Sequence, residues 1–210
     1  MTRGSRGAAS AAIAWLVCAG WAAPARAQTT GAGLEVGGHM SVLRLSEFDT
    51  TDTGAGLHAT WRAAPAVSLD GALTWFPGGD TATLANQIGR QERVLGLVGA
   101  RSGIRRSPAE LFGRARLGFL RFAPVDQAVC IAVTTVPLPL DCQIAVGYTA
   151  LATDLGAGVA LNITDRLRIG ADAGDLMVRY GIKSHRKNGE PTDGFTSHNL
   201  QVSTGVTWRF

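Results

Sequence analysis

Charged side chains recur at every second position in several stretches of this sequence. Arg114 and Arg116 lie in one stretch, and Asp154 and Asp172 lie in two others. Guanidinium and carboxylate groups that share an interior must pair, because a buried charge without a partner is costly. The pattern predicts an ion-paired plug, with a narrow polar pore as the alternative. The predicted set is Glu35, Arg62, Asp70, Arg114, Arg116, Asp154, Arg168, Asp172 and Arg209.

Few other residues have a spacing that points to catalysis or ligand binding. His39 and His58 are predicted to face the same interior from neighbouring strands, and two histidines can begin a metal site. No Cys/His cluster completes such a site, so we predict no metal and no cofactor. Ser197 and His198 form the one pair that suggests a hydrolase, which needs a nucleophile, a base and an orienting group. We predict no catalytic residue.

The first 27 residues have the features of a secretory leader. Arg3 and Arg6 precede an apolar run from Ala8 to Ala23, and small residues follow at the positions that a signal peptidase reads. The run is too short and too rich in alanine to span a bilayer well. We predict cleavage between Ala27 and Gln28, which leaves residues 28–210 as a single mature domain.

Removal of the leader changes both the charge and the thiol content. Three of the 20 basic residues leave with it, so the net charge falls from +4 to 17 minus 16, or +1. Nucleic-acid binding therefore has no support. Cys130 and Cys142 remain in an oxidising compartment and are predicted to form a disulfide across an apolar loop, which is either an adhesive patch or a packed cap. Lipoprotein processing at Cys18 is an alternative, although Val17 occupies a position that normally holds a small residue.

The mature chain alternates apolar and polar residues with period two, which is typical of β-strands. One face of each strand is apolar, and the other carries charges and glycines. The stretch 93–103 is apolar on both faces, so its orientation is ambiguous. The eight predicted strands are 34–42, 55–62, 67–75, 93–103, 114–119, 154–162, 167–174 and 199–210.

The connections and aromatic residues indicate where such strands lie. Short links near 63–66, 104–110 and 164–166 alternate with longer links at 46–53, 77–91, 123–143 and 181–196. Short turns on one side and long loops on the other are typical of outer-membrane barrels, whose backbone groups must all be paired. Aromatic residues are expected at the two interfaces. We expect Trp61, Trp208 and Phe210 at the inner rim, and Trp75, Phe76, Phe119, Phe122, Tyr148 and Tyr180 at the outer rim.

The fold prediction is therefore all-β, an eight-stranded antiparallel transmembrane β-barrel of up-and-down topology. A soluble, exported, lipocalin-like barrel is the competing interpretation, since period two alone does not separate the two. Eight strands enclose an interior that side chains can fill.

Three stretches carry a resemblance to a known family. They are LFGRARLGFLRF (111–122), LGAGVALNITDRLRIGADAGDLMVRYG (155–181) and HNLQVSTGVTWRF (198–210). The mature chain resembles the small OmpA/OmpX-like outer-membrane barrels, and Trp208 with the terminal Phe210 looks like the signal read by the outer-membrane assembly machinery. The resemblance implies a monomer in the cell outer membrane that contacts periplasmic chaperones, the assembly machinery, outer-membrane lipid and lipopolysaccharide.

Three functions follow from these observations. The leading hypothesis is a structural or surface-interaction role in the bacterial envelope. The alternative is a narrow, porin-like channel for small solutes. A lipid A-modifying enzyme is the third.

Overall fold

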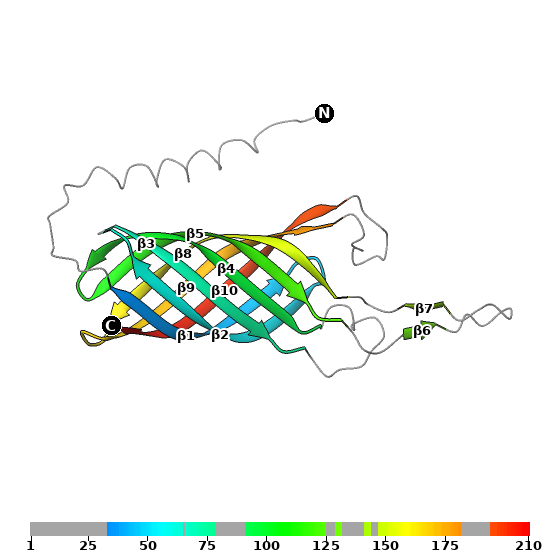
Figure 1. The fold of residues 1–210 in the computed structure, drawn as a ribbon, viewed down its shortest axis with the longest axis horizontal. Helices are drawn as coiled ribbons and strands as arrows, with labels where there is room; N and C mark the ends of the chain where they lie inside the picture. The colour runs from blue at the N-terminus through cyan, green and yellow to red at the C-terminus, as the bar shows by residue number, and fades with distance from the viewer. Residues whose placement is uncertain are drawn as a thin grey trace, which may run out of the picture. The chain divides into compact units, whose positions relative to one another are not determined.

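Eight long strands close into one antiparallel barrel in the computed structural model (Figure 1). The structure describes residues 33–64, 66–78, 91–124, 129–131, 141–143, 147–181 and 194–210. The barrel strands are β1 Leu34–Leu45, β2 Thr50–Arg62, β3 Val67–Phe76, β4 Arg93–Arg106, β5 Ala109–Phe122, β8 Tyr148–Asn162, β9 Leu167–Tyr180 and β10 Phe195–Arg209. Each strand pairs with the next one along the barrel, and β1 pairs with β10. The predicted eight-stranded, all-β fold is confirmed.

Two short strands were not predicted. β6 Val129–Ile131 and β7 Asp141–Gln143 pair only with each other, in the connection between β5 and β8. No helix in the described ranges is long and apolar enough to cross a membrane.

The barrel strands are strongly staggered. Paired residues can be followed from Leu34 across all eight strands, and the path returns to β1 at Arg44, ten residues further along. A stagger of this kind tilts the strands by roughly 35–45° to the barrel axis. The tilt determines how far each strand rises along the barrel axis, and therefore how tall a band its outward side chains form.

The two ends of the barrel differ. At the turn end, β2–β3, β4–β5 and β8–β9 are joined by residues 63–66, 107–108 and 163–166. At the loop end, the connections are 46–49, 77–92, 123–147 and 181–194. The first loop was predicted to be long, but it has four residues because β2 already begins at Thr50. The other three alternate with the short turns as expected.

The outer face of the barrel is apolar. Large apolar side chains point outward on all eight strands, among them Met40, Leu57 and Val98, which are 52%, 67% and 65% exposed. On β1 the outward positions are apolar or glycine from Leu34 to Val42, and Arg44 follows. Ten residue steps of about 3.3 Å, tilted by about 40°, give a band about 25 Å tall, the height of the apolar band on membrane barrels.

Aromatic residues correct one prediction. Trp75 and Phe119 face outward near the loop end, and they are 49% and 42% exposed. Phe76, Phe122 and Tyr180 instead point into the barrel and are about 1% exposed, so the interpretation of these residues as interface aromatics is wrong. Tyr148 packs against the same interior cluster. The physical reason is parity, because Trp75 and Phe76 are neighbours in a strand and must lie on opposite faces.

Candidate functional site in the barrel interior

Polar side chains near the turn end form an inner cluster around two carboxylates. Glu35 accepts from Arg62 at 3.2 Å, Arg168 at 3.0 Å and Arg209 at 3.1 Å. These partners come from β2, β9 and β10, so a single carboxylate on β1 links four strands. The glutamate is 5% exposed.

Glu110 is the second carboxylate of this inner cluster. It accepts from Arg101 at 3.0 Å and from Arg105 at 2.6 Å, and it also pairs with Arg168. Arg168 therefore joins the Glu35 and Glu110 groups into one network. Sequence reasoning missed Arg101 because the apolar stretch 93–103 concealed which face of β4 points inward. It missed Arg105 and Glu110 because it placed both in the link 104–110, whereas β4 extends to Arg106 and β5 begins at Ala109.

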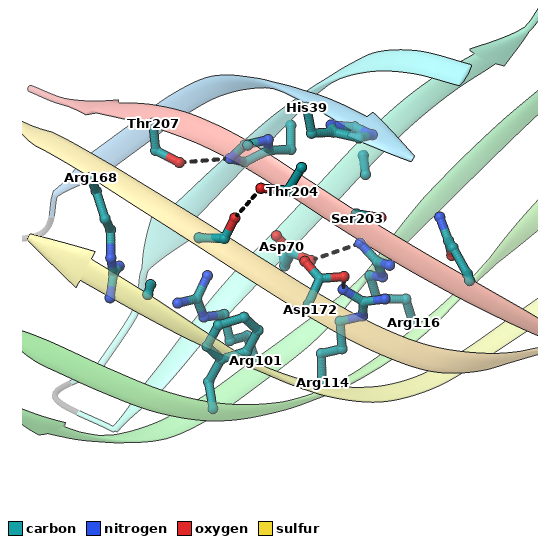
Figure 2. A pocket seen from close by; sticks show the side chains of 17 residues that line it. His39, Asp70, Arg101, Arg114, Arg116, Arg168, Asp172, Ser203, Thr204 and Thr207 are labelled. Atoms are coloured by element: carbon teal, nitrogen blue, oxygen red, sulfur yellow. Dashed lines mark hydrogen bonds and ion pairs between the residues drawn. The ribbon is translucent and has the colours of Figure 1, made fainter. Parts of the chain in front are cut away.

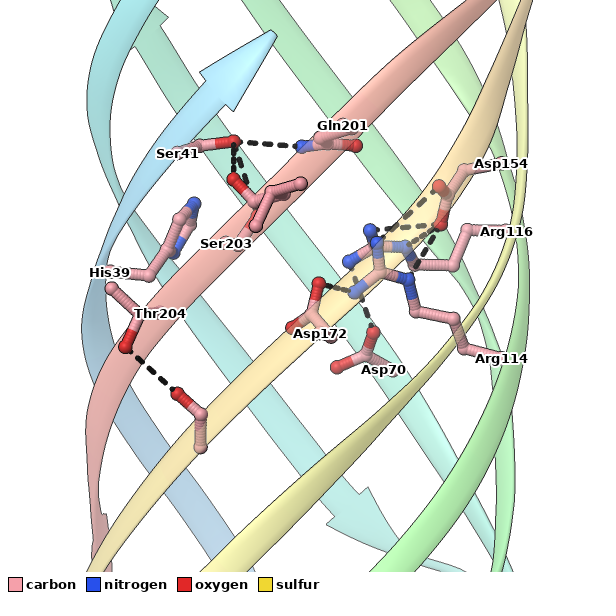
Figure 3. Close-up of polar contacts among 12 residues, drawn as sticks. His39, Ser41, Asp70, Arg114, Arg116, Asp154, Asp172, Gln201, Ser203 and Thr204 are labelled. Atoms are coloured by element: carbon pink, nitrogen blue, oxygen red, sulfur yellow. Dashed lines mark hydrogen bonds and ion pairs between the residues drawn. The ribbon is translucent and has the colours of Figure 1, made fainter.

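A central cluster lies further toward the loop end. Asp154 is fully buried and accepts from Arg114 Nε at 2.8 Å and Arg116 Nε at 2.9 Å. Arg116 also reaches Asp70 at 3.3 Å, and Arg114 pairs with Asp172. Figure 3 shows the three carboxylates gathered around the two guanidinium groups. All nine residues of the predicted set thus point into the barrel, and they divide between these two clusters.

Two histidines face the central cluster across the barrel. The His39 and His58 rings are 5.5 Å apart, and each Nε2 lies 2.8 Å from a threonine hydroxyl, Thr74 and Thr207 respectively. Each ring rests where a glycine leaves room. A Cβ on Gly37 would lie 2.8 Å from the His58 ring, and a Cβ on Gly56 would lie 2.8 Å from the His39 ring.

A small cavity separates the histidines from the arginines (Figure 2). Its volume is about 60 Å³, which suits a few water molecules and is too small for an organic solute. Among the described residues, no group of three or more His, Cys, Asp or Glu side chains is placed to hold a metal ion. His39 and His58 are each hydrogen-bonded within the interior, to Thr74 and Thr207 respectively.

An apolar seal fills the interior at the loop end. It consists of buried apolar residues from seven of the eight strands. β2 contributes Gly54, whose missing side chain leaves room for the Phe76 ring. Phe48, from the short β1–β2 loop, packs edge-on against Phe122 and Tyr180 at 6.1 and 6.0 Å. The other members are Leu43, Leu45, Phe76, Leu95, Leu97, Leu120, Ala150, Ala152, Leu176, Val178 and Phe195.

One ion pair is embedded in this seal. Arg93 is the largest fully buried side chain in the described ranges, and it pairs with Asp52. Its guanidinium also lies over the ring of Phe122. Sequence reasoning placed Asp52 in a loop and therefore missed the pair. The available signal was the β-branched Thr50, Thr51 and Thr53 ahead of the predicted strand, a residue type that favours strands.

Ser197 and His198 do not form a hydrolytic site together. Ser197 is 5% exposed and points inward, whereas the His198 side chain is 66% exposed on the outer face. His198 Nδ1 lies 2.7 Å from Asp175, which also faces outward. Adjacent positions of a strand point to opposite faces, so the nucleophile and base are separated by the barrel wall.

The remaining predicted residues belong to the predicted leader, to the connection between β5 and β8 and to the end of the chain after β10. The register of β6 and β7 places Cys130 opposite Cys142, but the side chains of both lie outside the described residues, so the disulfide stays a prediction. Ala27, Gln28 and the leader also lie outside them. Trp208 and Phe210 are exposed on the outer face at the turn end, 45% and 77% respectively.

Comparisons with known proteins support the fold. No protein-family description matches the chain, and no curated protein sequence matches it. Among solved structures, Neisserial surface protein A is 16% identical, with a TM-score of 0.51, and the match covers 86% of this chain and 98% of that one. The N-terminal barrel of Pseudomonas aeruginosa OprF is 12% identical, covering 85% and 97%, with a TM-score of 0.48. The Yersinia pestis attachment invasion locus protein Ail is 13% identical, covering 86% and 100%, with a TM-score of 0.45.

These likenesses concern architecture. At 16% identity no residue role is transferred, and the chain is similar to Neisserial surface protein A in its barrel alone. The chain thus has the fold of the small outer-membrane barrels, in agreement with the predicted resemblance.

Proposed function

We propose that this chain is an outer-membrane barrel with a closed lumen, which has a structural or surface-interaction role in the envelope. The apolar seal is the observation that carries the proposal. It packs buried apolar residues from seven strands into the loop end, while ion pairs occupy the interior toward the turn end. An ion crossing the seal would lose its hydration among leucine and aromatic side chains, where the buried charges Arg93 and Asp52 are already paired with each other, and this is costly.

The competing functions have weaker support. A channel needs a continuous polar path, and the described interior offers a cavity of about 60 Å³ below an apolar layer. A lipid A-modifying enzyme needs its nucleophile beside its base, and Ser197 and His198 face opposite sides. Specificity then falls to the loop-end connections, of which residues 77–92, 123–147 and 181–194 are long enough to present a surface.

The proposal includes the partners expected from the sequence. The apolar band meets outer-membrane lipid and lipopolysaccharide, the barrel is a monomer, and Trp208 and Phe210 serve as the assembly signal. The exposed position of both aromatic side chains at the end of β10 supports that last role.

Single-channel recording tests the closed lumen. The leaderless protein is refolded, its barrel is verified by heat-dependent gel mobility, and it is inserted into a planar bilayer. We expect no stable current steps. Reproducible steps that change in the Arg114→Gln/Arg116→Gln variant would contradict the proposal and establish the channel. An Arg106→Gln/Arg166→Gln variant, with both changes on exposed residues at the turn end, controls for altered charge.

A further inference from the structure

Cationic side chains form an arc on the outer face at the loop end of the barrel. We define this basic arc as Arg44 of β1, Arg121 of β5 and Arg179 of β9. Each follows the last apolar outward residues of its strand, so the arc marks the upper edge of the apolar band. The corresponding outward positions on β2 are Thr51 and Thr53, and those on β3 and β4 are Trp75 and Val94. The positive charge therefore lies on one side of the barrel.

The acidic side chains near the arc each have a hydrogen-bond or ion-pair partner. Asp175 lies 2.7 Å from His198, and Asp49 lies 3.9 Å from Arg44. Glu92, beside β5, accepts from the Trp75 indole at 2.6 Å. Within the ranges that the structure describes, no carboxylate lies within 4 Å of the Arg121 or Arg179 guanidinium. Two guanidinium groups that can donate hydrogen bonds to an anion thus face outward at the edge of the apolar band.

The geometry of the two arginines fits a ligand with more than one phosphate. Arg121 lies opposite Thr149 of β8, and Arg179 lies opposite Leu151 of the same strand. The two therefore flank β8, two inter-strand spacings apart across the sheet and two residues apart along it, which puts their Cα atoms about 12 Å apart. Arg179 is also anchored, because its Nη1 donates to Thr196 Oγ1 at 3.3 Å. Guanidinium groups bind phosphate by paired, charge-assisted hydrogen bonds.

We propose that the basic arc binds the phosphates of a phosphorylated glycolipid, the lipid A disaccharide, in the outer leaflet. The inference rests on the proposed outer-membrane role, which places the loop end at the cell surface. A phosphorylated disaccharide presents phosphate groups on both sugars, just above its acyl chains. Its acyl chains then lie along the apolar band, and its phosphates meet Arg121 and Arg179.

Native mass spectrometry of the detergent-folded protein tests the site. The probes are bisphosphorylated lipid A, dephosphorylated lipid A and phosphatidylglycerol. We expect Arg121→Gln/Arg179→Gln to weaken binding of bisphosphorylated lipid A by about tenfold, since hydrogen bonds to charged groups are lost. The matched control is Arg106→Gln/Arg166→Gln at the turn end, which we expect to bind as the unaltered protein does. Dephosphorylated lipid A should bind all three proteins equally and weakly.

Two results would overturn the inference. One is equal affinity of the Arg121→Gln/Arg179→Gln variant and the unaltered protein for bisphosphorylated lipid A. The other is equal affinity of the unaltered protein for phosphatidylglycerol, which would indicate a general anion surface. Conductance is recorded on the same preparations. Current steps would contradict the proposed closed lumen but would leave the lipid A binding result standing. A closed barrel with no preference for lipid A would contradict this inference alone.

Discussion

The Arg93 guanidinium carbon lies 5.2 Å from the centre of the Phe122 ring, within the apolar half of the barrel. A cation is stabilised by the face of an aromatic ring, and more so where water is excluded. Asp52 supplies the opposite charge. The arrangement is a charged bridge from β4 to β2, surrounded by leucine, phenylalanine and tyrosine side chains.

Removal of this bridge should destabilise the barrel. Arg93→Met leaves Asp52 without its cation inside the seal, and breaking a buried pair from one side costs about 3 kcal/mol. Urea unfolding in lipid vesicles, followed by tryptophan fluorescence, measures the loss. The double variant Arg93→Met/Asp52→Asn should recover part of it, because the stranded charge is then also removed. A double variant no more stable than the single one would contradict this interpretation.

Asp154 should be the most sensitive carboxylate of the central cluster. Asp154→Asn removes the charge that neutralises both Arg114 and Arg116, and we expect a loss of about 3 kcal/mol or more in the free energy of unfolding. Asp165→Asn, in the exposed β8–β9 turn, is the matched control and should leave the urea midpoint unchanged. Equal midpoints for the two variants would show that the cluster contributes little to stability.

The tryptophans report directly on the membrane band. Trp15 and Trp21 lie in the predicted leader, which leaves Trp61, Trp75 and Trp208, all outward-facing and close to the ends of the band. Lipids brominated near the headgroup should therefore quench the fluorescence more than lipids brominated at the chain ends. As a control, Phe76→Trp in a protein whose three tryptophans are replaced by phenylalanine should be quenched by neither lipid, because residue 76 faces the interior. Stronger quenching from the bilayer centre would contradict the assigned band.

The cysteine pair should affect the β6–β7 hairpin and not the barrel. We expect the exported protein to carry no free thiol by maleimide labelling, since β6 and β7 set Cys130 opposite Cys142. Cys130→Ser/Cys142→Ser should leave the urea midpoint of the barrel unchanged, because β6 and β7 pair only with each other. The same variant should make the 123–147 connection more susceptible to protease. Quantitative labelling of both cysteines would refute the disulfide.

The strand pattern predicts the barrel well, because alternation decides which side chains point inward. It places Glu35, Asp70 and Asp154 in the interior, and the structure finds them there. Alternation fails where both faces are apolar. Near the loop end, the inward Leu95 and Leu97 and the outward Val94 and Val98 carry no polarity contrast, so the apolar seal is not readable from the sequence.

The sequence also does not show which interior charges pair with one another. Alternation indicates that Arg114 and Arg116 face inward, but it does not say which carboxylate each one meets. That information lies in the stagger, which brings Asp154 opposite Arg116 and places Asp70 within reach across the lumen. A pattern read along one strand does not contain the offset between strands, and the pairings therefore required the structure.

The pairing between the first and last strands, β1 and β10, is fixed in register by charge as well as by the apolar pattern. In the closing seam, Glu35 of β1 is the register partner of Arg209 of β10, and the two are ion-paired at 3.1 Å. A slip of one residue would turn the interior arginines toward lipid. A slip of two would keep every face correct but would set Glu35 opposite Thr207 and part it from Arg209. The Glu35–Arg209 pair thus favours the native register over a two-residue slip, which hydrophobic patterning alone does not disfavour.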